Sequence, residues 1–203
     1  YFLSDFWYRT TFEWKKTSEG RTFLNFDGIN WTAEVYLNGK RIGRIDGAFI
    51  RGRFDITGQV NEGQNVLAVK IIRNAHPGAV KEKNEMNTDI NGGLLGLDNP
   101  TYHSNRGWDW ISTVRGRNIG IWNNVFLSSE KAVSLTDPLV STHLCGGSTS
   151  VTPEVVVRSN SSEDVTGILR GWIGEILFEK EITVRGGEVR RASFIPEEFS
   201  QLK

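Results

Sequence analysis

The chain has 203 residues, and its 24 Lys and Arg balance 24 Asp and Glu, so the formal net charge is zero. Nucleic acids and anionic membrane surfaces select clustered positive charge, so this balance argues against both partners. Cys145 is the only cysteine, which excludes an internal disulfide. No apolar run approaches the ~20 residues that a membrane-spanning helix needs. Twenty-two Gly, seven Trp and eleven Phe favour β-structure over helix.

Strand-like patterns begin close to the start of the chain. From Tyr8 to Trp14, aromatic residues recur at every second position or nearly so, which is the period of a half-buried strand. Asn38-Gly39 follows an alternating segment and predicts a hairpin, because a type I′ turn needs positive φ at both central residues. Further strands are expected at residues 23–26, 33–37, 53–56 and 66–72. No window sustains a 3.6-residue apolar period, so the chain is predicted to be all-β.

The strand pattern stops over the 45 residues from Asn74 to Asn118, which carry seven Asn, six Gly and two Pro. Loops of this length inside compact domains are uncommon, and most are functional or disordered. Disordered segments are usually poor in aromatic residues, whereas this one contains Trp108-Asp109-Trp110. We therefore expect an ordered functional loop without clear strands or helices. The strand pattern returns at Ile119–Leu127.

A second set of strand-like segments begins near Ser128. The expected strands are residues 132–135, 154–158, 165–172, 175–184 and 188–195. Their spacing suits a small immunoglobulin-like sandwich, which needs about 100 residues and about seven strands. We therefore predict two domains, residues 1–130 and residues 131–203, of which the second is incomplete.

Four segments resemble, in the same order, the sugar-binding domain of glycoside hydrolase family 2. They are Trp7–Phe12, Phe26–Asn30 with Val35–Lys40, Phe54–Thr57 with Gly63–Val69, and Gly120–Val125. The resemblance implies a jelly-roll (galactose-binding-like) β-sandwich, then an immunoglobulin-like β-sandwich, then a (β/α)₈ catalytic barrel. Gly107–Ile111 and Arg115–Trp122 resemble the branch of β-mannosidases, exo-β-glucosaminidases and mannosylglycoprotein endo-β-mannosidases. Ile111-Ser112 departs from the Gly-Pro of many β-mannosidases, which leaves the sugar open.

The family retains configuration and uses two Glu residues, which lie in the barrel. This chain has no alternating βα pattern, so no catalytic residue is assigned to it. The resemblance implies a non-catalytic region of a hydrolase directed at β-mannosides or β-glucosaminides, with no cofactor. Its expected partners are carbohydrate, bound through the parent active site, and the barrel of the same polypeptide. The compartment is left open, with a periplasmic or secreted setting favoured over the cytoplasm.

Asp109 is the main candidate site residue. In the branch that the chain resembles, an Asp of this loop reaches the sugar in the barrel. Aromatic faces pack against the C–H face of a sugar while a carboxylate accepts from its hydroxyls, so Trp108 and Trp110 are predicted to bind substrate as well. The alternative is a surface loop in which the tryptophans pack on the sandwich and Asp109 caps a turn. Arg117, and with it Arg106 and Arg115, either orients a carboxylate or is solvated.

Two other observations limit the function. His76, His103 and His143 are far apart and lack ligand-like spacing, so no metal site is expected. Asp55 is predicted to be a structural turn acceptor. A free-standing carbohydrate-binding module is the main alternative function, and it should offer an exposed aromatic platform. A purely structural sandwich protein would have no need for the long Trp-containing segment.

Overall fold

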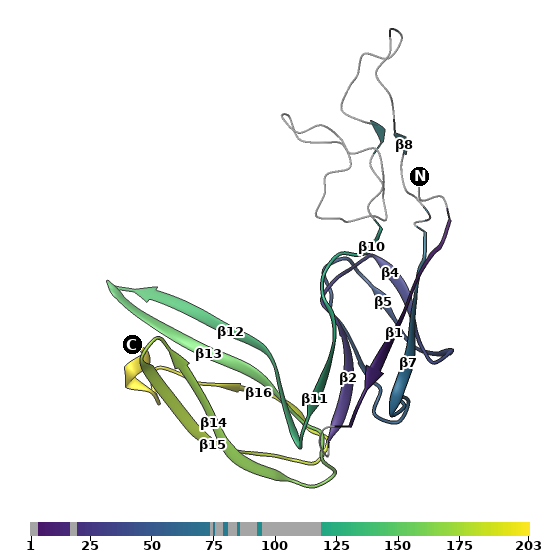
Figure 1. The fold of residues 1–203 in the computed structure, drawn as a ribbon. Helices are drawn as coiled ribbons and strands as arrows, with labels where there is room; N and C mark the ends of the chain where they lie inside the picture. The colour runs from purple at the N-terminus through teal and green to yellow at the C-terminus, as the bar shows by residue number, and fades with distance from the viewer. Residues whose placement is uncertain are drawn as a thin grey trace. The chain divides into compact units, whose positions relative to one another are not determined.

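The computed structural model describes residues 4–16, 20–73 and 119–203, together with Ala75, Ala79–Val80, Glu85 and Gly93–Leu94. Within these residues the chain is built of β-strands, with one short 3₁₀ helix at Ser200–Leu202 (Figure 1). Two compact units are present, Tyr1–Thr17 with Thr22–Ser128, and Ser18–Arg21 with Ser129–Lys203. A search of the described residues finds no helix with the length and apolar character needed to span a membrane.

The first unit contains a four-stranded and a three-stranded sheet. The four-stranded sheet has the order β1 (Phe6–Trp14), β7 (Gly63–Ile71), β4 (Thr32–Leu37), β5 (Lys40–Asp46). The three-stranded sheet has the order β11 (Val125–Glu130), β2 (Arg21–Phe26), β6 (Gly52–Asp55). Two shorter pairs join β3 (Ile29–Asn30) to β10 (Gly120–Ile121) and β8 (Ala79–Val80) to β9 (Gly93–Leu94).

The core lies between the two sheets and follows from the alternation along their strands. In β4, Ala33, Val35 and Leu37 are buried, whereas Glu34 and Tyr36 lie on the opposite face. Leu67, Val69 and Ile71 of β7 belong to the same cluster, which the three-stranded sheet completes with Leu24 and Phe26. Successive side chains of a strand point to opposite faces, so one face of each sheet is apolar and the other polar.

The chain passes between the sheets in a jelly-roll order. β1, β4, β5 and β7 lie in the four-stranded sheet, and β2, β6 and β11 lie in the three-stranded sheet. In chain order, the strands therefore change sheets at every step except from β4 to β5. Such crossing between two antiparallel sheets is the mark of Greek-key jelly rolls. The predicted all-β fold, with a jelly-roll sandwich first, is confirmed.

The predicted hairpin turn at Asn38-Gly39 is present, with φ of 50° and 82° at the two residues. Asn65, which is 0% exposed, connects this turn to the start of β7. Its side-chain oxygen accepts from Asn38 Nδ2 and from the backbone N–H of Asn61, both at 2.8 Å. Its amide nitrogen donates to the carbonyl oxygens of Asn61 (2.8 Å) and Gly63 (2.9 Å). Every polar position of the buried amide is thus used.

Asp55 ends β6 as a turn acceptor, as predicted. Its Oδ1 accepts hydrogen bonds from the backbone N–H and the hydroxyl of Thr57, at 3.0 and 2.6 Å. The Thr57 hydroxyl oxygen in turn accepts from the backbone N–H of Thr22 at 2.9 Å. This turn therefore joins the end of β6 to the start of β2.

The second unit contains five strands in two sheets. The first sheet has the order β12 (Val133–Cys145), β13 (Ser148–Ser159), β16 (Val189–Ser193), and the second pairs β14 (Val165–Ile173) with β15 (Ile176–Val184). Their core cluster includes Val157, Leu169, Phe178 and Val184. The sandwich predicted for this region is present in the immunoglobulin-like class.

Two local predictions differ from the structure. β12 and β13 are much longer than the expected strands, because Gly146-Gly147 makes a tight turn with φ of 58° and 85°. Gly-Gly is a hairpin signal, but the residues around it are exposed on both faces, so no alternation of buried and exposed positions marked the strands. The short pair β8–β9 lies inside the segment expected to lack strands, and two-residue strands are too short to give a detectable period.

Replacing Asn65 with Ala should destabilise the first unit strongly. Each buried group left without a partner costs about 1–3 kcal/mol, so a loss of at least about 2 kcal/mol is expected. Urea denaturation followed by tryptophan fluorescence measures it, because Trp172 is the only tryptophan after residue 128. Asn61→Ala is the matched control, since the structure uses its backbone and leaves the side chain exposed. Equal stability of the two variants would contradict the assigned role.

Candidate functional site at the base of the long segment

The predicted substrate-binding residues Trp108, Asp109, Trp110 and Arg117 lie outside the described residues, as do Arg106 and Arg115. The structure instead describes where the segment that carries them leaves the sandwich and returns to it. Both points lie at one end of the four-stranded sheet, and we call this region the loop base. It comprises Asn30, Thr32, Ile72, Arg73 and Gly120.

Backbone hydrogen bonds fix both sides of the loop base. On the departing side, the N–H of Ile72 donates to the carbonyl oxygen of Thr32 at 3.0 Å. The next residue, Arg73, donates its N–H to Asp5 Oδ1 at 3.0 Å. On the returning side, Gly120 pairs with Asn30 in the β3–β10 ladder. The segment therefore starts and ends beside residues 30–32, although its ends are more than 40 positions apart in sequence.

Trp122 secures the returning side. Its indole Nε1 donates to the carbonyl oxygen of Ala48 at 3.1 Å, and its backbone N–H donates to the carbonyl oxygen of Gly28 at 3.2 Å. The Phe49 ring meets the indole edge-on, with centroids 6.3 Å apart. Gly28 lies flat against the indole, and a Cβ there would overlap the ring. Gly28 and Trp122 come from two of the family-like segments, and their contact explains why those residue types occur there.

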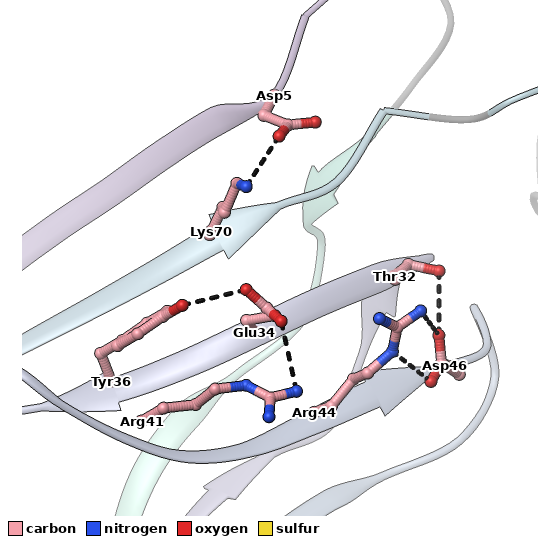
Figure 2. Close-up of polar contacts among 8 residues, drawn as sticks. All are labelled: Asp5, Thr32, Glu34, Tyr36, Arg41, Arg44, Asp46 and Lys70. Atoms are coloured by element: carbon pink, nitrogen blue, oxygen red, sulfur yellow. Dashed lines mark hydrogen bonds and ion pairs between the residues drawn. The ribbon is translucent and has the colours of Figure 1, made fainter.

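Ion pairs cover the outer face of the four-stranded sheet next to the loop base, as Figure 2 shows. Register places Trp7, Lys70, Glu34 and Arg44 in one row across the four strands. The polar contacts nearest the loop base are Lys70 Nζ to Asp5 Oδ2 (2.9 Å), Arg44 to Asp46 (2.6 and 2.9 Å) and Thr32 Oγ1 to Asp46 Oδ1 (3.2 Å).

Further along the same face lies an aromatic pair with its own carboxylate. The Trp7 and Tyr36 rings have centroids 5.4 Å apart, and Trp7 is 57% exposed. The Tyr36 hydroxyl donates to Glu34 Oε2 at 2.9 Å, and Arg41 contacts the other Glu34 oxygen at 3.2 Å (Figure 2). Ala68 of β7 is the residue opposite Tyr36, and its small side chain leaves room for the two rings. This surface combines an exposed ring with fixed hydrogen-bonding groups.

The pKa values of the ion-paired groups on this face are shifted toward their charged forms, whereas that of the Tyr36 hydroxyl is shifted toward its neutral form. The pKa of the Asp5 carboxyl is lowered, first by the backbone N–H of Arg73 and then by Lys70, whose own pKa Asp5 raises. The Arg44 side chain lowers the pKa of Asp46. The hydrogen bond to Glu34 raises the pKa of the Tyr36 hydroxyl. Asp5 and Asp46 are thus permanent acceptors at neutral pH, whereas the general acid of a glycosidase needs a raised pKa.

No sequence pattern pointed to the residues of this charged face. Lys70 and Asp46 are ordinary surface residues of strands and Asp5 directly precedes β1, and only the cross-strand register brings them onto one face. Among the residues that the structure describes, no three or more His, Cys, Asp or Glu side chains cluster in a way that could hold a metal ion.

The first unit is therefore a jelly-roll module of the galactose-binding type, with a long segment tied on both sides at one end of its larger sheet. The description "Glycosyl hydrolase 2 galactose-binding domain-like" matches residues 2–123, which is more than half of the chain. The chain belongs to glycoside hydrolase family 2.

The chain is similar in sequence to curated relatives with two different enzyme names. Mannosylglycoprotein endo-β-mannosidase of Lilium longiflorum is 37% identical over 133 residues, which are 65% of this chain and 14% of that protein. Exo-β-D-glucosaminidase of Streptomyces avermitilis is 28% identical over 202 residues, which are 96% of this chain and 20% of that protein. The resemblance to the branch suggested by Gly107–Ile111 and Arg115–Trp122 is thus confirmed.

Solved structures agree with this assignment. The exo-chitosanase of Amycolatopsis orientalis superposes with a TM-score of 0.69 at 27% identity, over 96% of this chain and 21% of that one. A family 2 β-galacturonidase from Eisenbergiella tayi shares the fold, with a TM-score of 0.66 at 20% identity. The chain spans between 14% and 21% of the length of the two curated relatives and the exo-chitosanase.

Gly28→Ala should weaken the loop base by forcing a methyl group into the Trp122 indole. Overpacking of this kind costs about 1–3 kcal/mol, and urea denaturation followed by tryptophan fluorescence would register it. Gly58→Ala is the matched control, because a Cβ at residue 58 has no neighbour within 4 Å. The packing role of Trp122 is wrong if both variants unfold at the wild-type urea concentration.

Proposed function

We propose that this chain is the non-catalytic front region of a retaining β-glycosidase directed at β-mannosides or β-glucosaminides. In this proposal the jelly roll occupies residues 1–130, and the immunoglobulin-like sandwich of residues 131–203 is completed by further sequence. Both sandwiches support a (β/α)₈ barrel in the same polypeptide, and the jelly roll lends loop residues to the barrel's sugar pocket. The proposal draws on relatives named for β-mannoside and β-glucosaminide chemistry, of which the chain spans one fifth or less.

The loop base is the observation that carries the proposal. Groups that contact a sugar must be held in a fixed geometry, and a rigid scaffold provides it. The sandwich ties both ends of residues 74–118 within three residues of one another on β3 and β4. Such a base allows a segment of this length to project a Trp-Asp-Trp triplet toward a neighbouring domain without loss of register in the sheet. Asp109 would then accept a hydrogen bond from a sugar hydroxyl, flanked by Trp108 and Trp110.

Three carboxyl groups among the described residues have properties that suit a non-catalytic role. Hydrolysis with retention needs a nucleophile and a general acid about 5–5.5 Å apart, and the acid must be protonated at working pH. Asp5, Asp46 and Glu154 have lowered pKa values, caused first by the Arg73 N–H, the Arg44 side chain and the Ser193 hydroxyl, respectively. These three groups are ionised acceptors and are unsuited to donate a proton.

One observation favours the alternative of a carbohydrate-binding module. Trp7 presents an exposed ring beside Tyr36, with Glu34 within reach on the same sheet face. Aromatic platforms of this kind bind the apolar faces of sugars. However, Glu34 already contacts both Tyr36 and Arg41, so a sugar would have to compete for its oxygens. We therefore rank this surface second to the loop segment.

The isolated 203-residue chain should hydrolyse no nitrophenyl β-glycoside and should bind simple sugars weakly. One hydrogen bond to a carboxylate and one aromatic contact supply about 2–4 kcal/mol, and the association costs an estimated ~4–15 kcal/mol. A dissociation constant of about millimolar or weaker is expected. Calorimetry with mannose, glucosamine and mannobiose measures it. Micromolar binding that Trp7→Ala abolishes would establish the alternative module.

In the full-length enzyme, Asp109→Ala should reduce kcat/KM by roughly 10- to 150-fold. The variant loses a charge-assisted hydrogen bond worth about 1.5–3 kcal/mol, at about 1.4 kcal/mol per tenfold. Steady-state kinetics on the best substrate provides the measurement. Asp89→Ala serves as the control, because it removes a second carboxylate from the same segment. If the Asp109 variant kept wild-type kcat/KM, the turn-capping interpretation of Asp109 would replace the proposal.

A further inference from the structure

An aromatic surface lies on the outer face of the four-stranded sheet. Trp7 belongs to β1 and Tyr36 to β4, and β7 runs between these two strands. Two strand spacings amount to roughly 10 Å, whereas the centroids of the two rings are 5.4 Å apart. The rings therefore lean toward each other across β7, where Ala68 is the residue opposite Tyr36. They form one surface, which we call the Trp7–Tyr36 platform.

Hydrogen bonds hold the platform in a fixed geometry. Trp7 is exposed and Tyr36 is half-buried. The Tyr36 hydroxyl donates to Glu34 Oε2 at 2.9 Å, and Arg41 contacts Glu34 Oε1 at 3.2 Å (Figure 2). A side chain that is held in place before binding loses little conformational entropy when a ligand packs on it. Rings of this kind pack against the apolar C–H face of a sugar.

The charges around the platform are not balanced. Two rows of residues cross this face of the sheet in register, namely Trp7, Lys70, Glu34 and Arg44, and then Arg9, Ala68, Tyr36 and Arg41. Three of the four cations in these rows pair with a carboxylate. The pairs are Lys70 with Asp5 at 2.9 Å, Arg41 with Glu34 at 3.2 Å and Arg44 with Asp46 at 2.6 Å. The fourth cation is Arg9, so the surface carries one positive charge in excess.

Arg9 lies beside the platform with its charge unpaired. Its side chain is exposed, and no residue in the part of the chain that the structure describes forms a hydrogen bond or an ion pair with its guanidinium. Register places Arg9 opposite Ala68, two residues from Trp7 on the same face of β1, which is a separation of about 7 Å. Glu13, the other charged residue on this face of β1, is four residues away, or about 13 Å. Screening at physiological ionic strength acts over about 8 Å, so Glu13 does not neutralise Arg9.

We propose that this surface binds an acidic sugar, a uronic acid residue within a β-linked glycan. The apolar face of the sugar packs on Trp7 and Tyr36, and its carboxylate pairs with the Arg9 guanidinium. A guanidinium presents its N–H donors in a planar fork that matches a carboxylate. Glu34 is already engaged by Tyr36 and Arg41, so the ligand meets donors at this surface rather than acceptors. The inference goes beyond the proposed function, which concerns the sugar that the parent enzyme hydrolyses.

The same charges disfavour other glycans. A chain of protonated amino sugars would place ammonium groups beside Arg9, and like charges at short range repel. A neutral chain would gain the aromatic contact alone. Two rings and one guanidinium give weak binding, with a dissociation constant of about millimolar for one sugar residue. The surface therefore suits a polymeric glycan, in which repeated residues raise the local concentration of ligand.

Two oligosaccharides that differ only in the group outside the sugar ring test the proposal, the hexasaccharides of β-linked mannuronate and of β-linked mannose. Each is titrated into the isotope-labelled 203-residue chain and followed by NMR. The indole N–H signal of Trp7, identified by its absence in Trp7→Phe, reports binding at the platform. The mannuronate ligand should shift this signal and bind about three- to fivefold more tightly than the mannose ligand, as expected for one surface charge pair. In Arg9→Gln the two ligands should bind equally.

Arg158→Gln is the matched control, because it removes the same charge from an exposed arginine of β13 in the second unit and should leave the preference for mannuronate unchanged. The proposal is wrong if the wild-type chain binds both ligands equally, or if other indole signals move while the Trp7 signal does not. It is also wrong if Arg158→Gln abolishes the preference as Arg9→Gln does, or if a glucosamine hexasaccharide binds more tightly than the mannose one. The readout needs no hydrolysis, so its outcome and that of the Asp109→Ala kinetics are independent.

Discussion

The described structure depends on one constraint, which is that the chain leaves for residues 74–118 and returns from them at the same end of the larger sheet. β3 and β4 provide the meeting point, since Thr32 accepts from Ile72 and Asn30 pairs with Gly120. Closing a loop of this length costs conformational entropy, although the cost grows only slowly with length. The sandwich offsets that cost where the chain returns to it, through the hydrogen bonds and packing of the Trp122 indole and of the neighbouring backbone. The segment is thereby anchored to the sandwich on both sides.

Much of the fold could be predicted from sequence because its signals are local. The alternation of apolar and polar residues in Ala33–Leu37 predicted which face of the strand is buried. Asn38-Gly39 predicted a turn in which both central residues have positive φ. The role of Asp55 as a turn acceptor followed from the chemistry of a short carboxylate near backbone N–H groups. Each of these features depends on residues within a few positions of one another. The family resemblance then ordered the strands into a jelly roll that local signals alone would have left open.

The candidate site was less predictable because its contacts are distant in sequence. Asp5 receives the N–H of Arg73, and Trp122 reaches Ala48, over separations of 68 and 74 positions. No spacing rule connects such residues; the sheet register does. The triplet around Asp109 was noticed from its aromatic residues, and its role was inferred from the family resemblance; that role is a proposal, which the Asp109→Ala kinetics would test. Asn65 is a polar residue within an otherwise apolar strand. This was the one sequence signal of its buried side chain, which makes four hydrogen bonds.

The long hairpin of the second unit has a consequence for how the chain opens. β16 supports β13 only between Glu154 and Arg158, so beyond this stretch β12 and β13 pair with each other alone. Residues 142–149, around the Gly146-Gly147 turn, are all exposed. A two-stranded ribbon without a third strand or a covering layer is marginally stable in water, and such regions open at a lower free energy than the core. Among the described residues, the tip of this hairpin is therefore where a protease would nick the chain first, with both cores still folded.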